Sequence, residues 1–467
     1  MVLESVNYQC PNCGGGLRFD GQKDRLVCEF CDSEFEVAQI EALYAEKETQ
    51  ATQKAEEAER QAAQRAQAAT QHGGGQDASG SEGPAADAQP AAGAGAQADT
   101  QEADGQTLNN EYVCSSCGAA LVTDATTAVT KCPYCGNPVV LQGRLTGAFS
   151  PELVIPFRLD HEAAKAALTR HYKGKILLPK GFKDTNHIDE VQGVYVPFWL
   201  YDAHAEGSAQ FEATRSRHYS RPDAEIIETD HFNVYREGNM DFSRIPVDAS
   251  SRMPNAHMDA IEPFDYAEMV PYSSAYMPGF VANRWDEDEN TCRPRAERRI
   301  NESTVGALEQ TVTGYESVTQ QNSNVDISWK HARHAMLPVW MLSTSWEGKN
   351  FLFAMNGQTG RLVGDLPIST PKLIVSIVLA FLAAFAVLVM LFGVEDVGKD
   401  ESSMIICIGS AAVFAAIIAF ALYGQMKSAH VATQADAYLD DGSFTLTGQN
   451  DQYRGTTHQV IPHPKKD

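Results

Sequence analysis

Two uninterrupted apolar stretches stand out in the second half of the chain, at 373–392 and 404–423. Each contains 20 residues without a charged side chain. A helix rises about 1.5 Å per residue, so each stretch is long enough to cross about 30 Å of hydrocarbon. We therefore predict a hairpin of two transmembrane helices, in preference to two helices buried in a soluble core.

The charges around these stretches predict their orientation. The connecting segment 393–403 has four acidic residues and one lysine, whereas Arg361 and Lys372 precede the first stretch and Lys427 follows the second. Basic residues are retained on the cytoplasmic side of a membrane. We expect a multi-pass membrane protein, with 393–403 outside and both termini in the cytoplasm, including the tail 424–467. The first residues, MVLESVNYQC, lack the pattern of a cleavable signal peptide.

Residues 150–370 mix short β-like runs with helical patterns. The β-like runs are 153–159, 193–202 and 350–357, and the helical ones are 161–172 and 293–318. The last β-like run ends in Asn356-Gly357, a pair that favours a hairpin turn. This mixture predicts an α+β cytosolic body.

A repeated pattern within the body favours an internal duplication. Trp199, Gly207 and Phe211 have a spacing close to that of Trp340, Gly348 and Phe351. We interpret each set as a strand, a turn and a second strand, although chance similarity between β-rich segments is an equal alternative. A true duplication predicts pseudo-twofold symmetry in the body.

The N-terminal region contains the strongest motif, two copies of Cys-x2-Cys-x14-Cys-x2-Cys. We predict a β zinc ribbon at 1–37 and a second at 111–145, with glycines after several cysteine pairs providing positive φ in the knuckles. The segment 38–71 has helical spacing, and 72–110 has the Gly, Ala, Pro and Asp content of a disordered linker. The two ribbons are therefore expected to be tethered rather than packed in series.

Eight of the ten cysteines belong to these motifs, which indicates metal ligation rather than disulfides. Four thiolates around one tetrahedral ion suit Zn²⁺ and leave no position for water or substrate. We predict two structural zinc ions and no other cofactor. The expected ligands are Cys10, Cys13, Cys28 and Cys31 for the first ion and Cys114, Cys117, Cys132 and Cys135 for the second.

The charge of the chain argues against nucleic acid as the partner of these ribbons. The formal net charge is -24. The first ribbon has three basic residues against seven acidic ones, and the second has two of each. Affinity for phosphate backbones depends on clustered Lys and Arg, so a nucleic-acid-binding ribbon protein at the membrane remains the less favoured alternative.

Catalytic motifs are not apparent, and we expect no enzymatic activity and no catalytic residues. His331 and His334 are interpreted as partly exposed histidines entering a strand, and the acidic run 286–290 as a solvated loop. An enzyme whose site lies in the body around these residues is a second alternative.

The chain resembles a bacterial family of membrane-anchored double zinc-ribbon proteins, the YdjG type. These proteins are also described as containing a TFIIB-type zinc ribbon, and sometimes as replication-restart helicase-like. The segments that carry the resemblance are YQCPNCGG, IPVDAS, IEPFDYAEMVPYSSAYMPGF, LPVW and FAMNGQTGRLVGDLPIS. The resemblance spans nearly the whole chain except the linker.

The resemblance implies a non-enzymatic membrane protein that acts with SPFH (flotillin-like) and phage-shock PspA-like proteins in membrane-stress responses. Closed zinc sites and an acidic surface agree with a role in protein recognition. We therefore expect a membrane-anchored adaptor or scaffold that recruits protein partners, with an oligomeric state that the sequence does not indicate.

Overall fold

The computed structural model describes most of the chain outside the linker. The described residues are 3–6, 8–47, 49, 110–113, 120–123, 127–131, 138–141, 150–185, 190–221, 224–392, 401–428 and 433–462. Most of the predicted helix 38–71, nearly all of the linker 72–110 and the segment 393–400 lie outside them. So do all four cysteines of the second predicted zinc site.

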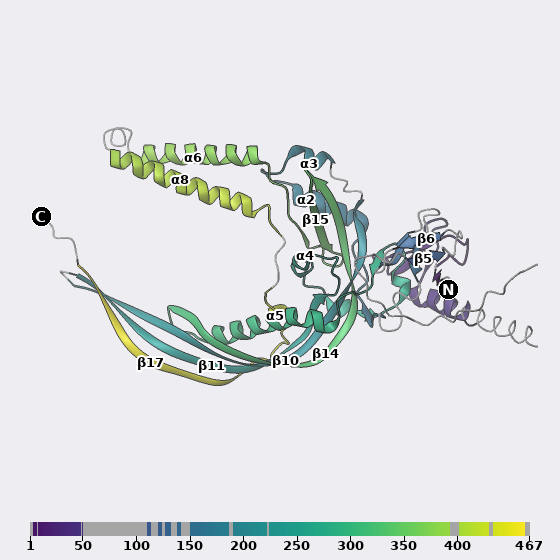
Figure 1. Ribbon diagram of the computed structural model, residues 1–467, viewed down its shortest axis with the longest axis horizontal. Helices are drawn as coiled ribbons and strands as arrows, with labels where there is room; N and C mark the ends of the chain where they lie inside the picture. The colour runs from purple at the N-terminus through teal and green to yellow at the C-terminus, as the bar shows by residue number, and fades with distance from the viewer. Residues whose placement is uncertain are drawn as a thin grey trace, which may run out of the picture.

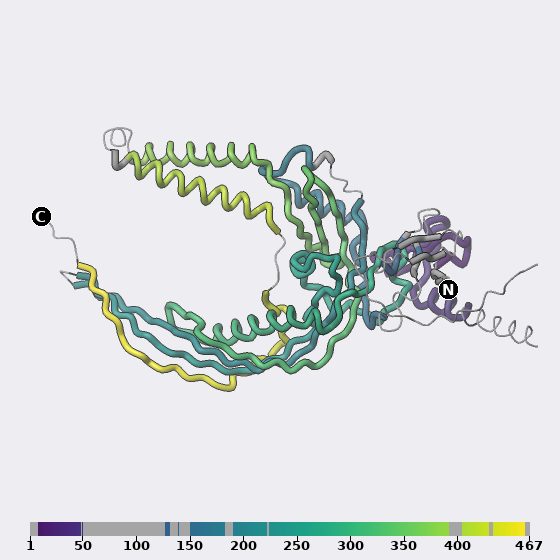
Figure 2. Tube along the Cα trace, in the orientation of Figure 1, coloured from purple at the N-terminus to yellow at the C-terminus, as the bar shows by residue number. Residues whose placement is uncertain are grey.

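Four long antiparallel strands dominate the structure (Figure 1). They are β10 (Gln192–Ser220), β11 (Ala224–Asp248), β14 (Ser317–Trp346) and β17 (Thr445–Pro462), in the order β17-β11-β10-β14. Their outer halves form a curved sheet that projects far from the rest of the molecule (Figure 2). We call this projection the arm, comprising 203–220, 224–242, 317–329 and 445–462.

Helix α5 (Glu289–Gln310) covers one face of the arm near its base. The face beneath it is lined by small side chains on β10, among them Ala203, Ala205 and Ala209, all of which are buried. A Cβ atom at Gly207 would lie 2.4 Å from Cγ2 of Thr304 on α5. Gly207 therefore permits the close approach of a helix.

This role of Gly207 contradicts the strand-turn-strand interpretation of the first repeat. Trp199, Gly207 and Phe211 all lie within the single strand β10. In the second set, β14 does end at Trp346, and Gly348 lies in the turn (φ 73°) before β15 (Lys349–Asn356). The glycine of the first set thus permits a helix contact, whereas the glycine of the second set forms a turn. The shared spacing therefore does not show an internal duplication.

The body is rich in β-structure, with helices packed around the inner halves of the long strands. Its smaller strands are β9 (Leu153–Val154), β12 (Val270–Pro271), β13 (Val281–Asn283), β15 and β16 (Leu362–Gly364), and its helices include α2 (His161–Tyr172), α3 (Lys180–Thr185) and α4 (Asn255–Ala260). Helix α2 matches the predicted 161–172. Helix α5 begins four residues earlier than the predicted helix 293–318. It also ends eight residues earlier than predicted, because Gly314 (φ 84°) turns the chain into β14.

The two ribbon regions contact each other and the body. Strand β1 (Leu3–Val6), at the start of the first ribbon region, pairs with β5 (Asn110–Val113) and β8 (Pro138–Leu141). Strand β7 (Thr127–Lys131) pairs with β8 and with β13 of the body, and β6 (Ala120–Thr123) pairs with β5. The expectation of two ribbons connected only by a tether is therefore wrong, because pairing between distant strands joins them.

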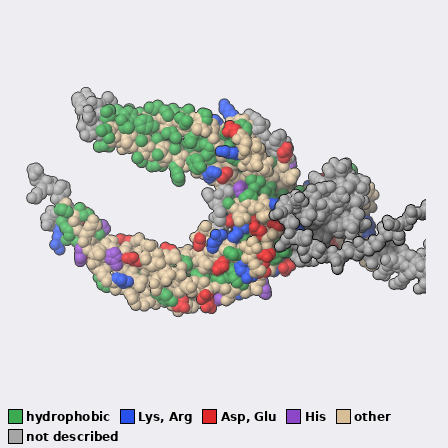
Figure 3. All heavy atoms as spheres, in the orientation of Figure 1, with side chains coloured by type: hydrophobic (Ala, Val, Ile, Leu, Met, Phe, Trp, Pro, Cys, Tyr) green, Lys and Arg blue, Asp and Glu red, His purple; other side chains and the backbone are tan. Residues whose placement is uncertain are grey.

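Helices α6 (Thr370–Phe392) and α8 (Glu401–Gly424) lie side by side as a hairpin (Figure 1). They contain stretches of 22 and 21 residues that are long and apolar enough to cross a membrane. Large apolar side chains such as Ile374, Leu379 and Phe420 are exposed on them, and Figure 3 shows this as a nearly continuous hydrophobic surface. The arm extends from the body in the same general direction as the hairpin (Figure 1).

Candidate metal centre

The first predicted cysteine set forms a compact cluster. The sulfur atoms of Cys10, Cys13, Cys28 and Cys31 all lie within 4.8 Å of one another. The Sγ atoms of Cys10 and Cys31 are 3.6 Å apart, and those of Cys13 and Cys28 are 3.5 Å apart. Zinc–sulfur bonds of about 2.3 Å place tetrahedral ligands about 3.8 Å from each other. The four thiols therefore fit one zinc ion.

Two knuckles with matching hydrogen bonds hold the cysteines. Gly14 N donates to Cys10 O at 2.9 Å, and Asp32 N donates to Cys28 O at 3.0 Å. Gly14 has the expected positive φ of 75°, whereas the equivalent position of the second knuckle is Asp32, with φ 55°. Aspartate is among the few residues that tolerate this region, so the second knuckle forms without a glycine.

Strands β2 (Leu17–Asp20), β3 (Arg25–Cys28) and β4 (Glu34–Phe35) form the small sheet of this ribbon, as predicted. Hydrogen bonds from the hydroxyl and backbone of Ser33 lower the pKa of Cys31, whereas the neighbouring thiols raise the pKa of Cys13 against a hydrogen bond from the Gly15 backbone. A lowered thiol pKa favours the thiolate form that binds metal. Four thiolates would complete the tetrahedral shell of a zinc ion and leave no coordination position for water or substrate.

Ion pairs occupy all three basic side chains of the first ribbon. Arg18 pairs with Glu29 at 3.1 Å, Arg25 pairs with Glu36 at 3.5 Å, and Lys23 pairs with Glu34. These pairs are exposed and each contributes little stability. Because of these pairs, the described part of this ribbon has no cluster of unpaired basic side chains that could bind phosphates.

The first ribbon is docked on the body. Phe19 N donates to Pro278 O at 3.0 Å, and the hydroxyl oxygens of Tyr8 and Ser274 are 2.5 Å apart. The Phe19 and Tyr276 rings meet edge to face with centroids 5.0 Å apart. A metal ion held by the four cysteines would therefore stabilise a module that packs directly on the body.

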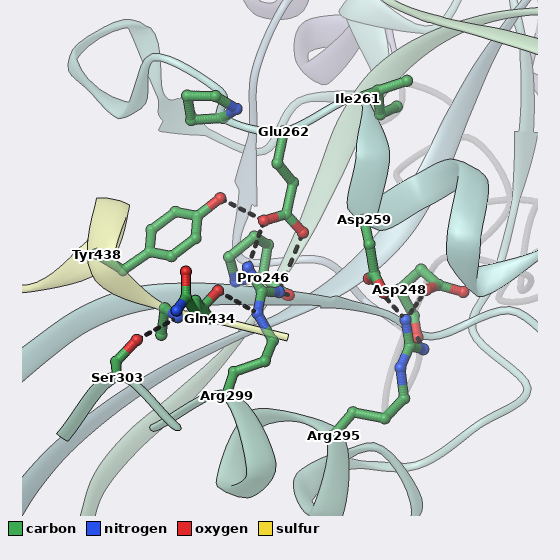
Figure 4. A network of polar contacts seen from close by, with 12 residues as sticks. Pro246, Asp248, Asp259, Ile261, Glu262, Arg295, Arg299, Ser303, Gln434 and Tyr438 are labelled. Carbon is green, nitrogen blue, oxygen red and sulfur yellow. Dashed lines mark hydrogen bonds and ion pairs between the residues drawn. The ribbon is translucent and has the colours of Figure 1, made fainter. Parts of the chain in front are cut away.

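A buried polar network, which the sequence did not predict, lies at the base of the arm (Figure 4). Arg299 on α5 donates through Nη2 to Glu262 Oε2 at 2.6 Å and through Nη1 to Glu262 Oε1 at 3.2 Å. It also donates to the backbone oxygens of Pro246 and Gln434. The Tyr438 hydroxyl donates to Glu262 at 2.6 Å. One arginine thus connects α5, the end of β11 and the chain that follows the hairpin.

Arg295, one helical turn earlier on α5, joins the network by binding Asp248 at 2.6 Å and Asp259 at 3.0 Å. Burial raises the pKa of Glu262 to about 7 and that of Asp248 to about 6, against the opposing effect of the arginines. One sequence signal could have found this network. Arg295 and Arg299 fall at helical spacing within the apolar stripe formed by Cys292, Ala296 and Ile300.

The residues considered for an enzymatic site have separate structural surroundings. His334 is buried against Trp199, with ring centroids 5.4 Å apart, and burial lowers its pKa to about 4, whereas His331 is exposed. In the acidic run, Asp286 accepts hydrogen bonds from Ser251 and Asp288 caps α5. Among the described residues, the cysteine cluster is the only group of three or more candidate ligands close enough to share a metal ion.

These features define a class of protein: a β-rich chain with a four-cysteine centre that could bind zinc and two apolar helices that could cross a membrane. The chain is 35% identical over 233 residues to the uncharacterized protein YdjG of Bacillus subtilis (strain 168). The match spans 50% of this chain and 68% of YdjG, so the chain belongs to the YdjG family. No family model matches the chain, and no solved structure matches it.

Proposed function

We propose that this protein is a non-enzymatic, membrane-anchored adaptor that recruits other proteins to the membrane. The observation that carries the proposal is the arm. Among the described residues, β17 pairs only with β11, and residues 317–329 of β14 pair only with β10. The arm therefore has two open edges, each with a row of N–H and C=O groups directed away from the sheet.

Open edges suit recognition of an extended peptide. A partner segment that adds as a further strand gains main-chain hydrogen bonds, and its alternate side chains meet the faces of the arm. The outer edge strand β17 is exposed along most of its length and carries polar side chains such as Gln452 and Gln459. We expect the adaptor to hold at least one partner in this way.

The zinc ribbons support the same role. The first centre has no open position for a reacting ligand, and the basic side chains around it are paired with carboxylates. We propose that a second structural zinc ion is bound by Cys114, Cys117, Cys132 and Cys135. Both ribbons would then extend the protein-binding surface of the body.

The membrane placement rests on the hairpin and the lysines at its base. Lys372 donates to Leu178 O at 2.5 Å, Lys427 pairs with Asp365 at 2.6 Å, and Lys175 donates to Gln425 O at 2.6 Å. A cluster of lysines at the body end of two apolar helices favours a cytoplasmic body. We therefore propose that both termini are cytoplasmic in a bacterial cytoplasmic membrane.

The open, polar edges of the arm are incompatible with hydrocarbon, since unpaired backbone groups are costly there. The arm and the hairpin leave the body in the same general direction (Figure 1). We therefore propose that the arm lies outside the hydrocarbon, on the cytoplasmic side.

Cysteine labelling tests this topology. With Gly398→Cys between the two helices, an impermeant maleimide should label whole cells. With Tyr219→Cys, near the tip of the arm, labelling should require inside-out vesicles. Each variant is the control for the other, because their accessible sides are opposite. Labelling of Tyr219→Cys in whole cells, or of Gly398→Cys only in inside-out vesicles, would refute the orientation.

We propose partners of the SPFH (flotillin-like) and PspA-like classes, in complexes that organise the membrane or respond to membrane stress. This choice follows from the family resemblance of the sequence. The acidic chain, independently of this choice, favours partners with basic surfaces.

Affinity purification from gently solubilised membranes, with and without nuclease, tests the adaptor function. We expect the same protein partners in both preparations. Cys114→Ser/Cys117→Ser should lose a subset of them, because removal of metal ligands unfolds a ribbon that depends on zinc. Loss of the partners on nuclease treatment, or tight DNA binding with a steep salt dependence, would instead indicate a nucleic-acid-binding protein.

A further inference from the structure

A cavity of about 690 Å³ lies where the two ribbon regions meet the body. The first ribbon contributes residues 18–22 and Glu29, and the second contributes Thr130 on β7. The body contributes the start of α2, the start of β10 and the segment 279–281. This volume falls within the range of about 300–1,000 Å³ that is usual for ligand sites, which often lie between domains.

Aromatic side chains form the floor of the cavity. The rings of Phe157 and Phe280 are stacked with centroids 4.1 Å apart, and Trp340 meets Phe157 edge to face at 5.2 Å. The Trp340 indole Nε1 donates to Leu159 O at 3.0 Å, which fixes the orientation of its ring. A preorganised floor of this kind can bind the apolar part of a ligand, or a cation through its π electrons.

The polar lining of the cavity is predominantly acidic. Its formally charged groups are four carboxylates, those of Asp20, Glu29, Asp160 and Glu190, and one guanidinium, that of Arg18, and the imidazole of His161 lies beside them. Arg18 is already paired with Glu29. Gln22 links the ribbon to the body across the lining, because its Nε2 donates to Asp160 Oδ2 at 2.6 Å. An anionic ligand would meet a repulsive field here, and a cationic one an attractive field.

We infer that this cavity binds a lysine or arginine side chain of a partner protein. The inference rests on the proposed adaptor function and specifies the chemistry that one of its partners presents. The aliphatic stem of such a side chain packs on the aromatic floor while its charged end reaches the carboxylates. Because the lining comes from both ribbon regions and the body, the site is complete only when the ribbons are folded and docked.

The test uses the full-length protein in detergent and the peptide acetyl-Arg-Arg-Arg-amide. Its citrulline analogue, which has the same shape without the charges, is the comparison ligand. We expect calorimetry to show at least about tenfold tighter binding of the arginine peptide, since a charged guanidinium forms stronger hydrogen bonds with carboxylates than a neutral donor does. Asp20→Asn/Glu190→Gln should weaken arginine-peptide binding about tenfold while keeping the side-chain shapes.

The matched control is Glu297→Gln/Glu302→Gln, which removes two exposed carboxylates of α5, a helix that contributes no residue to the cavity lining. This control should bind the arginine peptide like the unmodified protein. Equal effects of the two double substitutions would mean non-specific attraction to an acidic protein and would overturn the inference. Equal binding of the two peptides, or no binding of either, would overturn it as well.

Affinity purification with Asp20→Asn/Glu190→Gln separates this inference from the adaptor function. Loss of a nuclease-resistant partner from this variant supports both. Retention of every partner refutes the cavity as a partner site and leaves the adaptor function standing. Failure of the adaptor function itself is recognised in the unmodified protein, as the absence of nuclease-resistant partners.

Discussion

Replacing Cys28 by serine should remove about one zinc ion per chain and unfold the first ribbon. The sulfur of Cys28 lies within 4.8 Å of the other three candidate ligands, and its side chain is fully buried. Metal binding contributes about 10–16 kcal/mol to small structural zinc sites, far more than a module of this size gains from its own core. Metal analysis of the purified protein measures the loss directly.

Loss of the metal should also release the ribbon from the body. The contacts of Phe19 with Pro278 and of Tyr8 with Ser274 depend on the folded ribbon, so residues 8–47 should become sensitive to protease. Cys292→Ser is the matched control, because Cys292 is buried on α5 and is not part of the cluster. A Cys28→Ser protein that keeps its full zinc content would contradict the assignment of this centre.

Arg299→Met should destabilise the body by about 3–5 kcal/mol, the usual effect of removing one partner from a buried ion pair. Glu262 would lose both of its hydrogen bonds from Arg299 while remaining buried. The backbone oxygens of Pro246 and Gln434 would lose their donor as well. Chemical denaturation of the solubilised protein measures the difference in unfolding free energy.

The effect of Arg299→Met should depend on pH. Burial already raises the pKa of Glu262 to about 7, and loss of the arginine raises it further above its unfolded value. A carboxyl group with a raised pKa in the folded state destabilises the protein as pH increases. The deficit of the variant should therefore be larger at pH 8 than at pH 5.

Arg298→Met is the control for this experiment, since Arg298 is exposed on the same helix. Its effect should stay within about 0.5 kcal/mol, as is usual for surface substitutions. Equal effects of the two substitutions, or a deficit at Arg299 that does not change with pH, would show that the Glu262 pair does not stabilise the body.

The features that the sequence predicted correctly are encoded locally. The first metal cluster depends on two knuckles of six residues, and the hairpin depends on two continuous apolar stretches. Helix α2 can likewise be predicted from the sequence of its own twelve residues. Each of these features is set by neighbours in the chain, so one short window of sequence is sufficient to predict it.

The arm and the buried network could not be predicted in this way. Gly207 is typical of a turn, yet it lies within a strand because Thr304, almost a hundred residues later, packs against it. Tyr438 reaches Glu262 only after the chain has passed through the hairpin. Pairing between β1 and β5 similarly joins residues that flank the whole linker. Such contacts depend on tertiary structure that a local pattern does not contain.

The most direct test of the adaptor function is nuclease-treated affinity purification with the edge of the arm blocked. Gln452→Lys/Gln459→Lys places two charges on the exposed edge strand β17, which should prevent strand addition. Gln210→Lys/Gln310→Lys adds the same charges at exposed positions of an inner strand and of α5. We predict that the edge variant loses a partner which the unmodified protein and the control retain, with unchanged zinc content. Retention of every partner by the edge variant, or their loss from the unmodified protein after nuclease treatment, would contradict this account.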